Sequence, residues 1–359
     1  MGGRALKVES VRLSASKYAD IERTVIQSLQ RQFPGRRIEA VMAYADKPDF
    51  GDLDILIEGG AGYDPTQAAE ALQATEIVRN GDVTSIGITV PEGVFQVDLI
   101  KVPADSFDFA ARYFGLNDFG NLVGRIAHKF GAKFGHLGLS YAVRDLDNSS
   151  HLIAEITITT DFSAALVLLG YDAEHYEKLR TTGGFKALED IFRFVVSSPF
   201  ASREIYLLDN RNHAGRTRDA KRATYSAFLT WLEQQPTAAV PSYQWAQTGS
   251  PERQEQKTGF LKNAFAQFPK FKEDYEQALM DGERKKRVKI QFNGNLAAEV
   301  TGLSGKALGE LMFRVRNSFP DEDTFETFFI ESSREVVEAK FQQETKSHYG
   351  YDPTNAQKE

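Results

Sequence analysis

The sequence predicts an α+β fold, because helical and strand-like patterns alternate over its first 160 residues. Residues 17–33 carry apolar side chains at helical spacing until Pro34-Gly35 ends the pattern, and residues 65–79 predict a second helix. Runs rich in apolar and β-branched residues predict four strands, at 38–45, 53–57, 83–90 and 94–102. Pro91-Glu92-Gly93 joins the last two as a hairpin, so we expect a mixed, mostly antiparallel sheet.

The rest of the chain is expected to be largely helical. A helical stretch at 105–134, interrupted near 115–118, is followed by a strand region at 138–160. At least three helical pieces follow at 161–233, and then a linker at 234–259. A second helical stretch covers 260–345, with breaks at 293–294 and 302–305. We therefore expect three domains: 1–111, a thumb-like α+β unit at 112–204, and a mainly helical region at 205–359.

The composition argues against several classes of protein: nucleic-acid-coating, disulfide-bonded and membrane-spanning proteins. The 359 residues hold 43 Lys and Arg against 50 Asp and Glu, so a net charge of −7 argues against coating nucleic acid through a global positive field. There is no cysteine, which removes disulfides and thiolate metal sites. No apolar run reaches the roughly 18 residues of a membrane span, and the N-terminus lacks a signal-peptide pattern. We expect a cytoplasmic protein, neither secreted nor membrane-bound.

Three aspartates form the strongest chemical pattern. Asp52 and Asp54 open an apolar strand, where alternation sends both carboxylates to one face and their neighbours Leu53 and Ile55 to the core. Asp98 interrupts a second apolar strand. If the two strands pair, three carboxylates converge, and oxygen ligands of this kind suit Mg²⁺. The alternative is a turn cap and two solvent-facing acids without a metal.

The residues around these acids resemble the polymerase β nucleotidyltransferase superfamily. The matching segments are GDLDILI at 51–57, QVDLIKVP at 96–103, the ungapped stretch from Tyr113 to His128, and LEDIFRFVVSSPFASRE at 188–204. Within the superfamily they are most similar to the palm and thumb of family X DNA polymerases, over about residues 38–204. The resemblance implies a polymerase β-like palm. In such a palm Asp52 and Asp54 would bind both of two Mg²⁺ ions, and Asp98 the catalytic one, with Mn²⁺ able to substitute.

The resemblance also implies a nucleotide site downstream of the palm. Tyr113 and Phe114 would lie against the sugar of an incoming nucleoside triphosphate. Asp118 would lie against its base, Asn121 at the minor-groove edge of that base, and Arg125 on the template side.

The phosphate-binding segment departs from the family pattern. Where the family carries Gly-Ser and then basic residues, this chain has Ala43-Tyr44-Ala45-Asp46-Lys47, so Tyr44, Lys47 and the later Gly51 are the expected substrate contacts there. The family's Thr-Gly-Ser element reads Gly115-Leu116-Asn117. Only about fifty residues precede the acidic pair, too few for the amino-terminal lyase and helix-hairpin-helix modules of larger members.

Three basic segments are candidate nucleic-acid contacts, with a solvated helix face as the alternative for each. They are Arg125, Lys129, Lys133 and Arg144; Arg211, Arg216, Arg218, Lys221 and Arg222; and Arg284, Lys285, Lys286, Arg287 and Lys289. The family resemblance favours nucleic-acid contact for the first segment, and the other two lie outside the resemblance. Residues 292–315 resemble the carboxyl-terminal helical element of transfer-RNA nucleotidyltransferases. An ordinary helical hairpin would instead bury its leucines, Leu296, Leu308 and Leu311, with Met312.

These patterns predict a Mg²⁺-dependent nucleotidyltransferase that adds nucleotides to a nucleic-acid 3′ end and releases pyrophosphate. A compact family X-like DNA polymerase, with a role in DNA repair, is the first expectation, so DNA is the favoured partner. An RNA-tailing or transfer-RNA nucleotidyltransferase is the second. A catalytically inactive nucleic-acid-binding relative and an enzyme that modifies a protein or small acceptor remain open.

Overall fold

The computed structural model describes residues 5–148, 150–242 and 249–350. The chain forms two compact units. Unit 1 holds Met1–Ala142 and Glu155–Lys272, and unit 2 holds Val143–Ala154 and Glu273–Glu359. The expected division at 111 and 204 into three domains stays a prediction.

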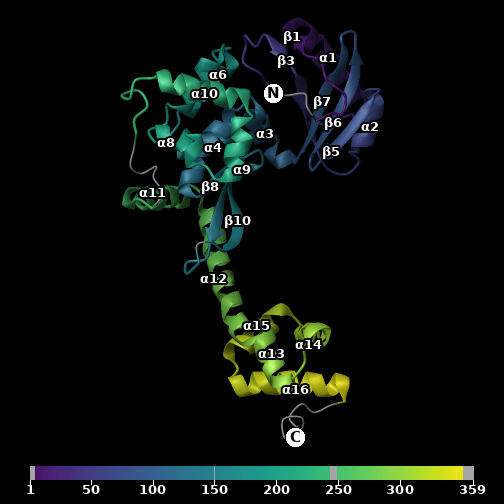
Figure 1. Ribbon diagram of the computed structural model, residues 1–359, viewed down its shortest axis with the longest axis vertical. Helices are drawn as coiled ribbons and strands as arrows, with labels where there is room; N and C mark the ends of the chain where they lie inside the picture. The colour runs from purple at the N-terminus through teal and green to yellow at the C-terminus, as the bar shows by residue number, and fades with distance from the viewer. Residues whose placement is uncertain (1–4, 149, 243–248, 351–359) are drawn as a thin grey trace. The chain divides into compact units, whose positions relative to one another are not determined.

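A five-stranded mixed sheet forms the first part of unit 1 (Figure 1). Its spatial order is β2 (Ile38–Ala40), β4 (Asp52–Glu58), β7 (Gly93–Val102), β6 (Val83–Val90) and β5 (Glu76–Asn80). Strands β4 and β7 run parallel, and the other neighbours are antiparallel. The mixed, mostly antiparallel sheet expected from the sequence is therefore confirmed.

The two faces of this sheet bury different helices. Helix α1 (Ala15–Gln32) and helix α2 (Pro65–Ala71) share one core with Leu53, Ile55 and Ile57 of β4. On the opposite face, Leu56 of β4 packs in a second core with α3 (Phe107–Phe114). Because side chains alternate along a strand, Asp52 and Asp54 share one face of β4, as the sequence predicts, and this is the face of Leu56 and α3.

The second helix expected at 65–79 is wrong beyond Ala71. Asp64 caps the start of α2 by accepting a hydrogen bond from the Thr66 N–H at 2.8 Å. Gln73 then takes a left-handed backbone conformation, with φ of 52°, which breaks the helix. The residues that follow pair with β6 as the edge strand β5, because backbone pairing at an open sheet edge outweighs local helical propensity.

The remainder of unit 1 is mainly helical around a small sheet. A short antiparallel pair, β1 (Leu13–Ser14) and β3 (Asp49–Phe50), stands beside α1. After η1 (Ala104–Ser106) and α3 come α4 (Phe119–Phe130), β8 (Ala132–Gly135), β9 (Gly138–Arg144), β10 (Leu152–Thr159), α5 (Phe162–Leu168), α6 (Ala173–Thr181), α7 (Leu188–Val195), α8 (Arg203–Tyr206), η2 (Leu208–Asn210), α9 (His213–Ala220), α10 (Ala223–Gln234) and α11 (Pro251–Gln267).

The linker expected at 234–259 is wrong at its carboxyl end, where α11 begins at Pro251. Ser250 caps this helix by accepting a hydrogen bond from the Arg253 N–H at 3.1 Å. Further along α11, the ring of Phe260 stacks on Phe130 with centroids 4.8 Å apart, so packing and capping together hold a polar sequence helical. Residues 243–248 of the expected linker lie outside the described part of the chain.

Unit 2 is a helical group with its own core. It contains most of α12 (Pro269–Gln291) followed by α13 (Gly294–Thr301), α14 (Gly305–Asn317), α15 (Glu322–Glu331) and α16 (Arg334–Tyr349). The expected breaks are confirmed: Asn293 caps α13, and Gly302 ends it with φ of 71°. Leu296 and Leu311 are buried, with Leu308 and Met312 packed against them, as an ordinary hairpin requires. Within the described residues, no helix is both long and apolar enough to cross a membrane.

Candidate metal and nucleotide site

The parallel pairing of β4 with β7 brings the three expected aspartates together. In its register Asp54 lies opposite Asp98, and Asp52 lies two residues earlier on the same face. One carboxylate oxygen from each of the three lies within 4.8 Å of the others. Asp98 accepts hydrogen bonds from Gln96 Nε2, at 3.0 Å to each of its oxygens, which fixes its carboxylate.

Burial and mutual repulsion disfavour the charged forms of these carboxylates, and Lys47 opposes that effect at Asp54. Burial, with the charges of Asp52 and Asp98, raises the pKa of Asp54 to about 8. Burial also raises the pKa of Asp98, with Asp52 adding to the shift and hydrogen bonds from Ser85 and Gln96 opposing it. Three close carboxylates with oxygen as the only donor type fit Mg²⁺ or Mn²⁺, and a bound cation would relieve their repulsion.

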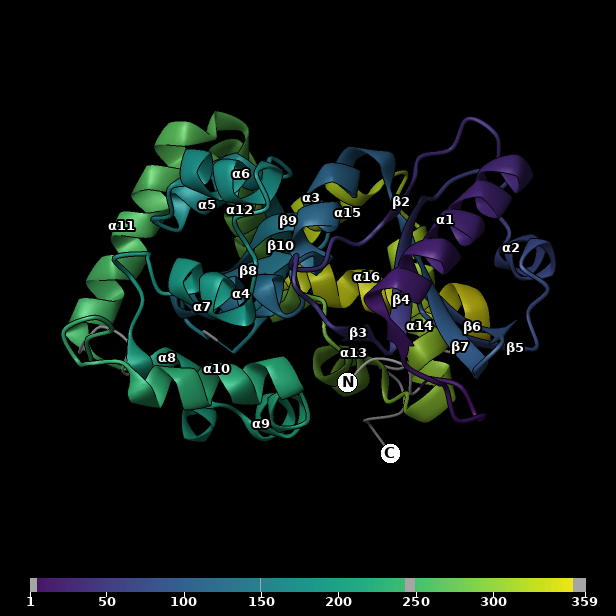
Figure 2. The ribbon, with the colours of Figure 1, turned by 90° about the horizontal axis from the view of Figure 1, so that it is seen from above.

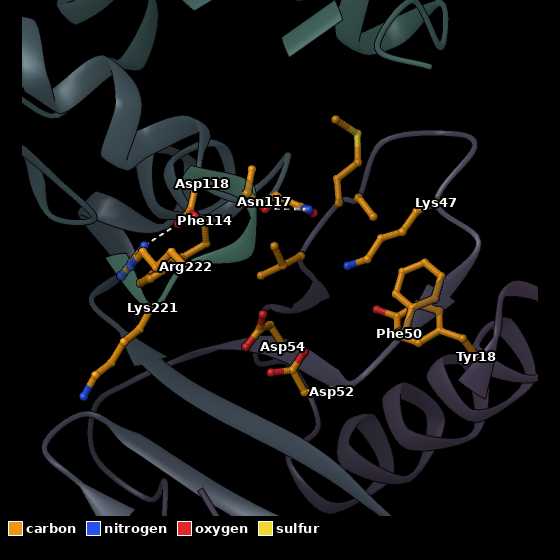
Figure 3. A pocket seen from close by; sticks show the side chains of 14 residues that line it. Tyr18, Lys47, Phe50, Asp52, Asp54, Phe114, Asn117, Asp118, Lys221 and Arg222 are labelled. Carbon is orange, nitrogen blue, oxygen red and sulfur yellow. Dashed lines mark hydrogen bonds and ion pairs between the residues drawn. The ribbon is translucent and has the colours of Figure 1, made fainter. Parts of the chain in front are cut away.

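A pocket of about 430 Å³ opens beside these acids. Figure 3 shows Asp52 and Asp54 at one wall, with Lys47 and Phe50 on one side and Phe114, Asp118 and Arg222 across from them. Its lining residues are Tyr18, Val41, Met42, Ala43, Lys47, Phe50, Asp52, Asp54, Phe114, Asn117, Asp118, Lys221, Arg222 and Thr224. The volume lies within the range of small-molecule sites.

Lys47 occupies the side of the pocket next to the acids. Its Nζ lies 4.4 Å from the centroid of the Phe50 ring, and Phe50 in turn stacks on Tyr18 with centroids 3.7 Å apart. Burial lowers the pKa of Lys47, while Asp52 and Asp54 oppose that shift. This ammonium is therefore held by an aromatic surface where it can meet an anionic substrate.

The backbone of the expected phosphate-binding segment is already used inside the protein. The N–H groups of Ala45 and Asp46 donate hydrogen bonds of 2.9 Å to the carbonyls of Phe185 and Lys186. Tyr44 is half-buried and is not among the pocket-lining residues. Gly51 is buried directly before Asp52 and does not line the pocket either. Of these expected contacts, the structure brings Lys47 alone to the pocket.

The sharp turn between α3 and α4 forms the opposite wall. Leu116 and Asn117 both adopt left-handed backbone conformations, with φ of 57° and 60°. The Leu116 N–H donates to the Met42 carbonyl at 2.8 Å, which ties the turn to the segment after β2. Phe114 and Asp118 line the pocket, whereas Tyr113 packs its ring against Phe114 and Phe134.

Asn121 and Arg125, which the resemblance places on the base and the template, point into the protein instead. Arg125 Nη2 donates to Asn121 Oδ1 at 3.0 Å, and Arg125 Nη1 lies 3.9 Å from Asp219 Oδ2. The Arg125 side chain is only 13% exposed. Neither residue lines the pocket.

Sequence reasoning missed several pocket residues. Tyr18 was expected only as part of a helix, and Asn117 only as a departure from the family pattern. Lys221 and Arg222 stood in a basic cluster without a location, and Thr224 carried no signal. Only the fold shows that Lys221 and Arg222, directly before α10, reach the pocket.

The basic segments are largely engaged within the protein. Arg211, Arg218 and Arg222 make ion pairs with acids of unit 1, and Lys133 pairs with Glu155 at 2.9 Å. In unit 2, Arg284 pairs with Asp323 and Glu326, and Lys286 with Asp145 and Asp147. These arrangements favour structural roles for the paired cations over contacts with a phosphate backbone.

No protein-family model matches the sequence of this chain, and a search of curated proteins finds no significant match. Function is therefore inferred from the residues of the pocket and their geometry.

Proposed function

We propose that this chain is a divalent-metal-dependent nucleotidyltransferase that adds nucleotides from a nucleoside triphosphate to a nucleic-acid 3′ end. The observation that carries the proposal is the convergence of Asp52, Asp54 and Asp98, with oxygens within 4.8 Å of one another, beside a pocket large enough for a nucleotide. When bound there, two Mg²⁺ ions supply positive charge that offsets the carboxylates and stabilises the attacking and leaving oxygens.

The chain's own residues have separate tasks in this reaction. The acceptor 3′-oxygen forms a bond to the α-phosphorus, the bond from that phosphorus to the bridging oxygen breaks, and pyrophosphate leaves with the electron pair. Asp98, fixed by Gln96, orients the acceptor hydroxyl and takes its proton. Lys47 binds the non-transferred phosphates, and Phe114 packs against the sugar. Lys47 and Phe114 line the pocket, and Asp98 lies next to it through its place beside Asp52 and Asp54.

The chemistry resembles that of family X DNA polymerases, which keeps a compact DNA polymerase as the first proposal for the acceptor. The altered phosphate segment, with its two internally bonded N–H groups, favours a second candidate, an RNA-tailing or transfer-RNA nucleotidyltransferase. The two candidates differ in acceptor and nucleotide, and they share the same three acids.

The test is nucleotide addition by the full chain. DNA and RNA oligonucleotides labelled at the 5′ end are incubated with dNTPs or NTPs and either Mg²⁺ or Mn²⁺, and product length and pyrophosphate release are measured. We expect lengthening by the wild type and none by Asp54→Asn. The matched control Asp20→Asn removes an exposed carboxylate from α1 and should leave activity unchanged. No lengthening under any condition would favour the inactive nucleic-acid-binding relative instead.

A further inference from the structure

A buried charge network joins α4 to the segment before α10. Its centre is Asp219, whose side chain is 0% exposed. Arg211 Nη2 and Arg218 Nε each lie 3.0 Å from one of its oxygens, and Arg125 Nη1 lies 3.9 Å away. Figure 2 shows α9 beside α10, and the two helices are in contact. We call this group the Asp219 network; its members are Arg211, Asp219, Asn121 and Arg125.

The Asp219 network holds inward the two side chains that would have to read a base pair. Asn121 uses its Oδ1 for Arg125, and its Nδ2 is buried without a hydrogen-bond partner among the described residues. Turning Arg125 outward would break its bonds to Asn121 and weaken the counter-charge of a fully buried carboxylate. Reading a template through these residues would therefore work against the fold.

A different set of polar groups lies at the pocket. Arg222 lies directly before α10 and makes an ion pair with Asp118, drawn as a dashed line in Figure 3. Thr224 Oγ1 lies 3.4 Å from Asn117 Nδ2. All four side chains line the same pocket as Asp52 and Asp54.

We propose that nucleotide selection here is independent of a template, and that the protein chooses the base through Asn117, Thr224 and the Asp118–Arg222 pair. This inference rests on the proposed function, because it concerns the nucleotide that the three acids transfer. The amide, hydroxyl and charged groups offer both donors and acceptors to the polar edge of a base, which is the edge that a template strand would otherwise occupy. The acceptor is then an unpaired 3′ end, which needs no duplex contact at Arg125.

Single-nucleotide addition to defined ends tests this inference. One 5′-labelled oligonucleotide is used single-stranded and annealed to four templates that differ only in the templating base, with each nucleotide supplied alone. We expect one nucleotide to be preferred on all five substrates, with rates within about threefold between templates. A preferred nucleotide that changes with the templating base, or at least tenfold weaker addition to the single strand, would overturn the inference while leaving nucleotidyl transfer intact.

Two substitutions test whether Asn117 and Thr224 determine which nucleotide is added. Asn117→Gly preserves a left-handed backbone, and Thr224→Val preserves shape while removing the hydroxyl. Each should change the ratio between preferred and disfavoured nucleotides by tenfold or more at an unchanged melting temperature. Thr230→Val, an exposed threonine on the same helix, is the matched control and should leave the ratio unchanged. Unchanged ratios in Asn117→Gly and Thr224→Val would contradict the proposal.

Arg125→Lys separates a structural arginine from a template reader. We expect a lower melting temperature and an unchanged nucleotide preference. A changed preference on templated ends with an unaltered melting temperature would show that Arg125 reads the duplex. If the wild type adds no nucleotide to any end, the proposed function fails, and the inference fails with it.

Discussion

Unit 1 contains two groups of buried charge that are built in opposite ways. At the β4–β7 pair, three carboxylates crowd together and the pKa of Asp54 rises to about 8. At the α4–α9 contact, the single carboxylate of Asp219 is surrounded by guanidinium groups of three arginines. The first group has excess negative charge at a pocket, and the second has its charges paired within the fold.

This difference distinguishes a candidate binding site, the three acids, from a structural ion-pair network, the one around Asp219. Charges that are buried and paired stabilise one arrangement of helices, but they have little left to offer a ligand. Charges that are crowded and unbalanced make the folded chain less stable by themselves, so they are favourable only when a cation binds. Asp219 and the three acids should therefore respond in opposite ways to loss of a carboxylate.

The largest expected effect is on activity at the acid cluster. Asp98→Asn keeps the size of the side chain and its ability to accept from Gln96, but it removes a charge that a metal needs. We expect nucleotide addition to fall by about 10³-fold or more. The melting temperature without metal should stay the same or rise, because repulsion from Asp52 is relieved. A marked fall in melting temperature would mean that Asp98 is mainly structural.

The next effect is on stability at the Asp219 network. Asp219→Asn leaves Arg211 and Arg125, 11% and 13% exposed, without their buried counter-charge. We expect the free energy of unfolding to fall by about 3–5 kcal/mol, measured by urea denaturation. Asp161→Asn is the matched control: Asp161 is an exposed helix cap, and Asn caps a helix about as well as Asp, so the unfolding free energy should change little. A loss for Asp219→Asn no larger than that of the control would remove the contrast between the two groups.

The sequence predicted the acid cluster better than the Asp219 network for a physical reason. Asp52 and Asp54 lie in an alternating strand pattern, and Asp98 interrupts another, so two local patterns and one pairing suffice to bring them together. Arg125 and Asp219 are far apart in the chain; the resemblance implied a template contact for Arg125, and no sequence pattern marked Asp219 as its partner. Only the packing of α9 against its neighbours shows that these charges are buried.

A smaller effect concerns the turn that carries the pocket wall. A Cβ on Gly120 would lie 2.4 Å from the Tyr113 carbonyl oxygen, so Gly120→Ala forces α4 away from α3. We expect a loss of about 1–3 kcal/mol in unfolding free energy, with weaker nucleotide binding at Asp118. On the same helix, a Cβ on Gly124 would meet nothing closer than 3.5 Å. Gly124→Ala is therefore the matched control and should stabilise by about 0.5–1 kcal/mol. Equal effects of the two substitutions would show that the close approach is unimportant.

The smallest effect is a pH dependence behind the pocket wall. Burial lowers the pKa of His136 from its usual 6.5, with Lys133 adding to the shift and Asp82 opposing it. Below pH of about 6.5 the unfolded chain binds a proton there that the folded chain resists, so stability falls as the pH falls. His136→Phe should reduce the loss of stability between pH 7.5 and pH 5.5, by about 1 kcal/mol at most. An identical loss in wild type and variant would exclude this role.

The sequence was less informative wherever long-range pairing decided the structure. The helix expected over 65–79 became a helix and an edge strand, because β6 offered an open edge to Glu76–Asn80. The linker expected at 234–259 includes the start of α11. The polar sequence of these first turns is typical of a loop, and the helix is stabilised by the stacking of Phe260 on Phe130, which the sequence does not reveal. By contrast, the hairpin of β6 and β7 was predicted from its own residues, because its pairing is local.

The most direct test is to locate manganese in crystals of the full chain grown with Mn²⁺ and a non-hydrolysable nucleoside triphosphate. We predict anomalous peaks bound by oxygens of Asp52, Asp54 and Asp98, with the triphosphate beside Lys47. Density that leaves these three carboxylates without a metal, or that places Asp98 facing away from the other two, would contradict the assignment of this cluster as the reaction centre.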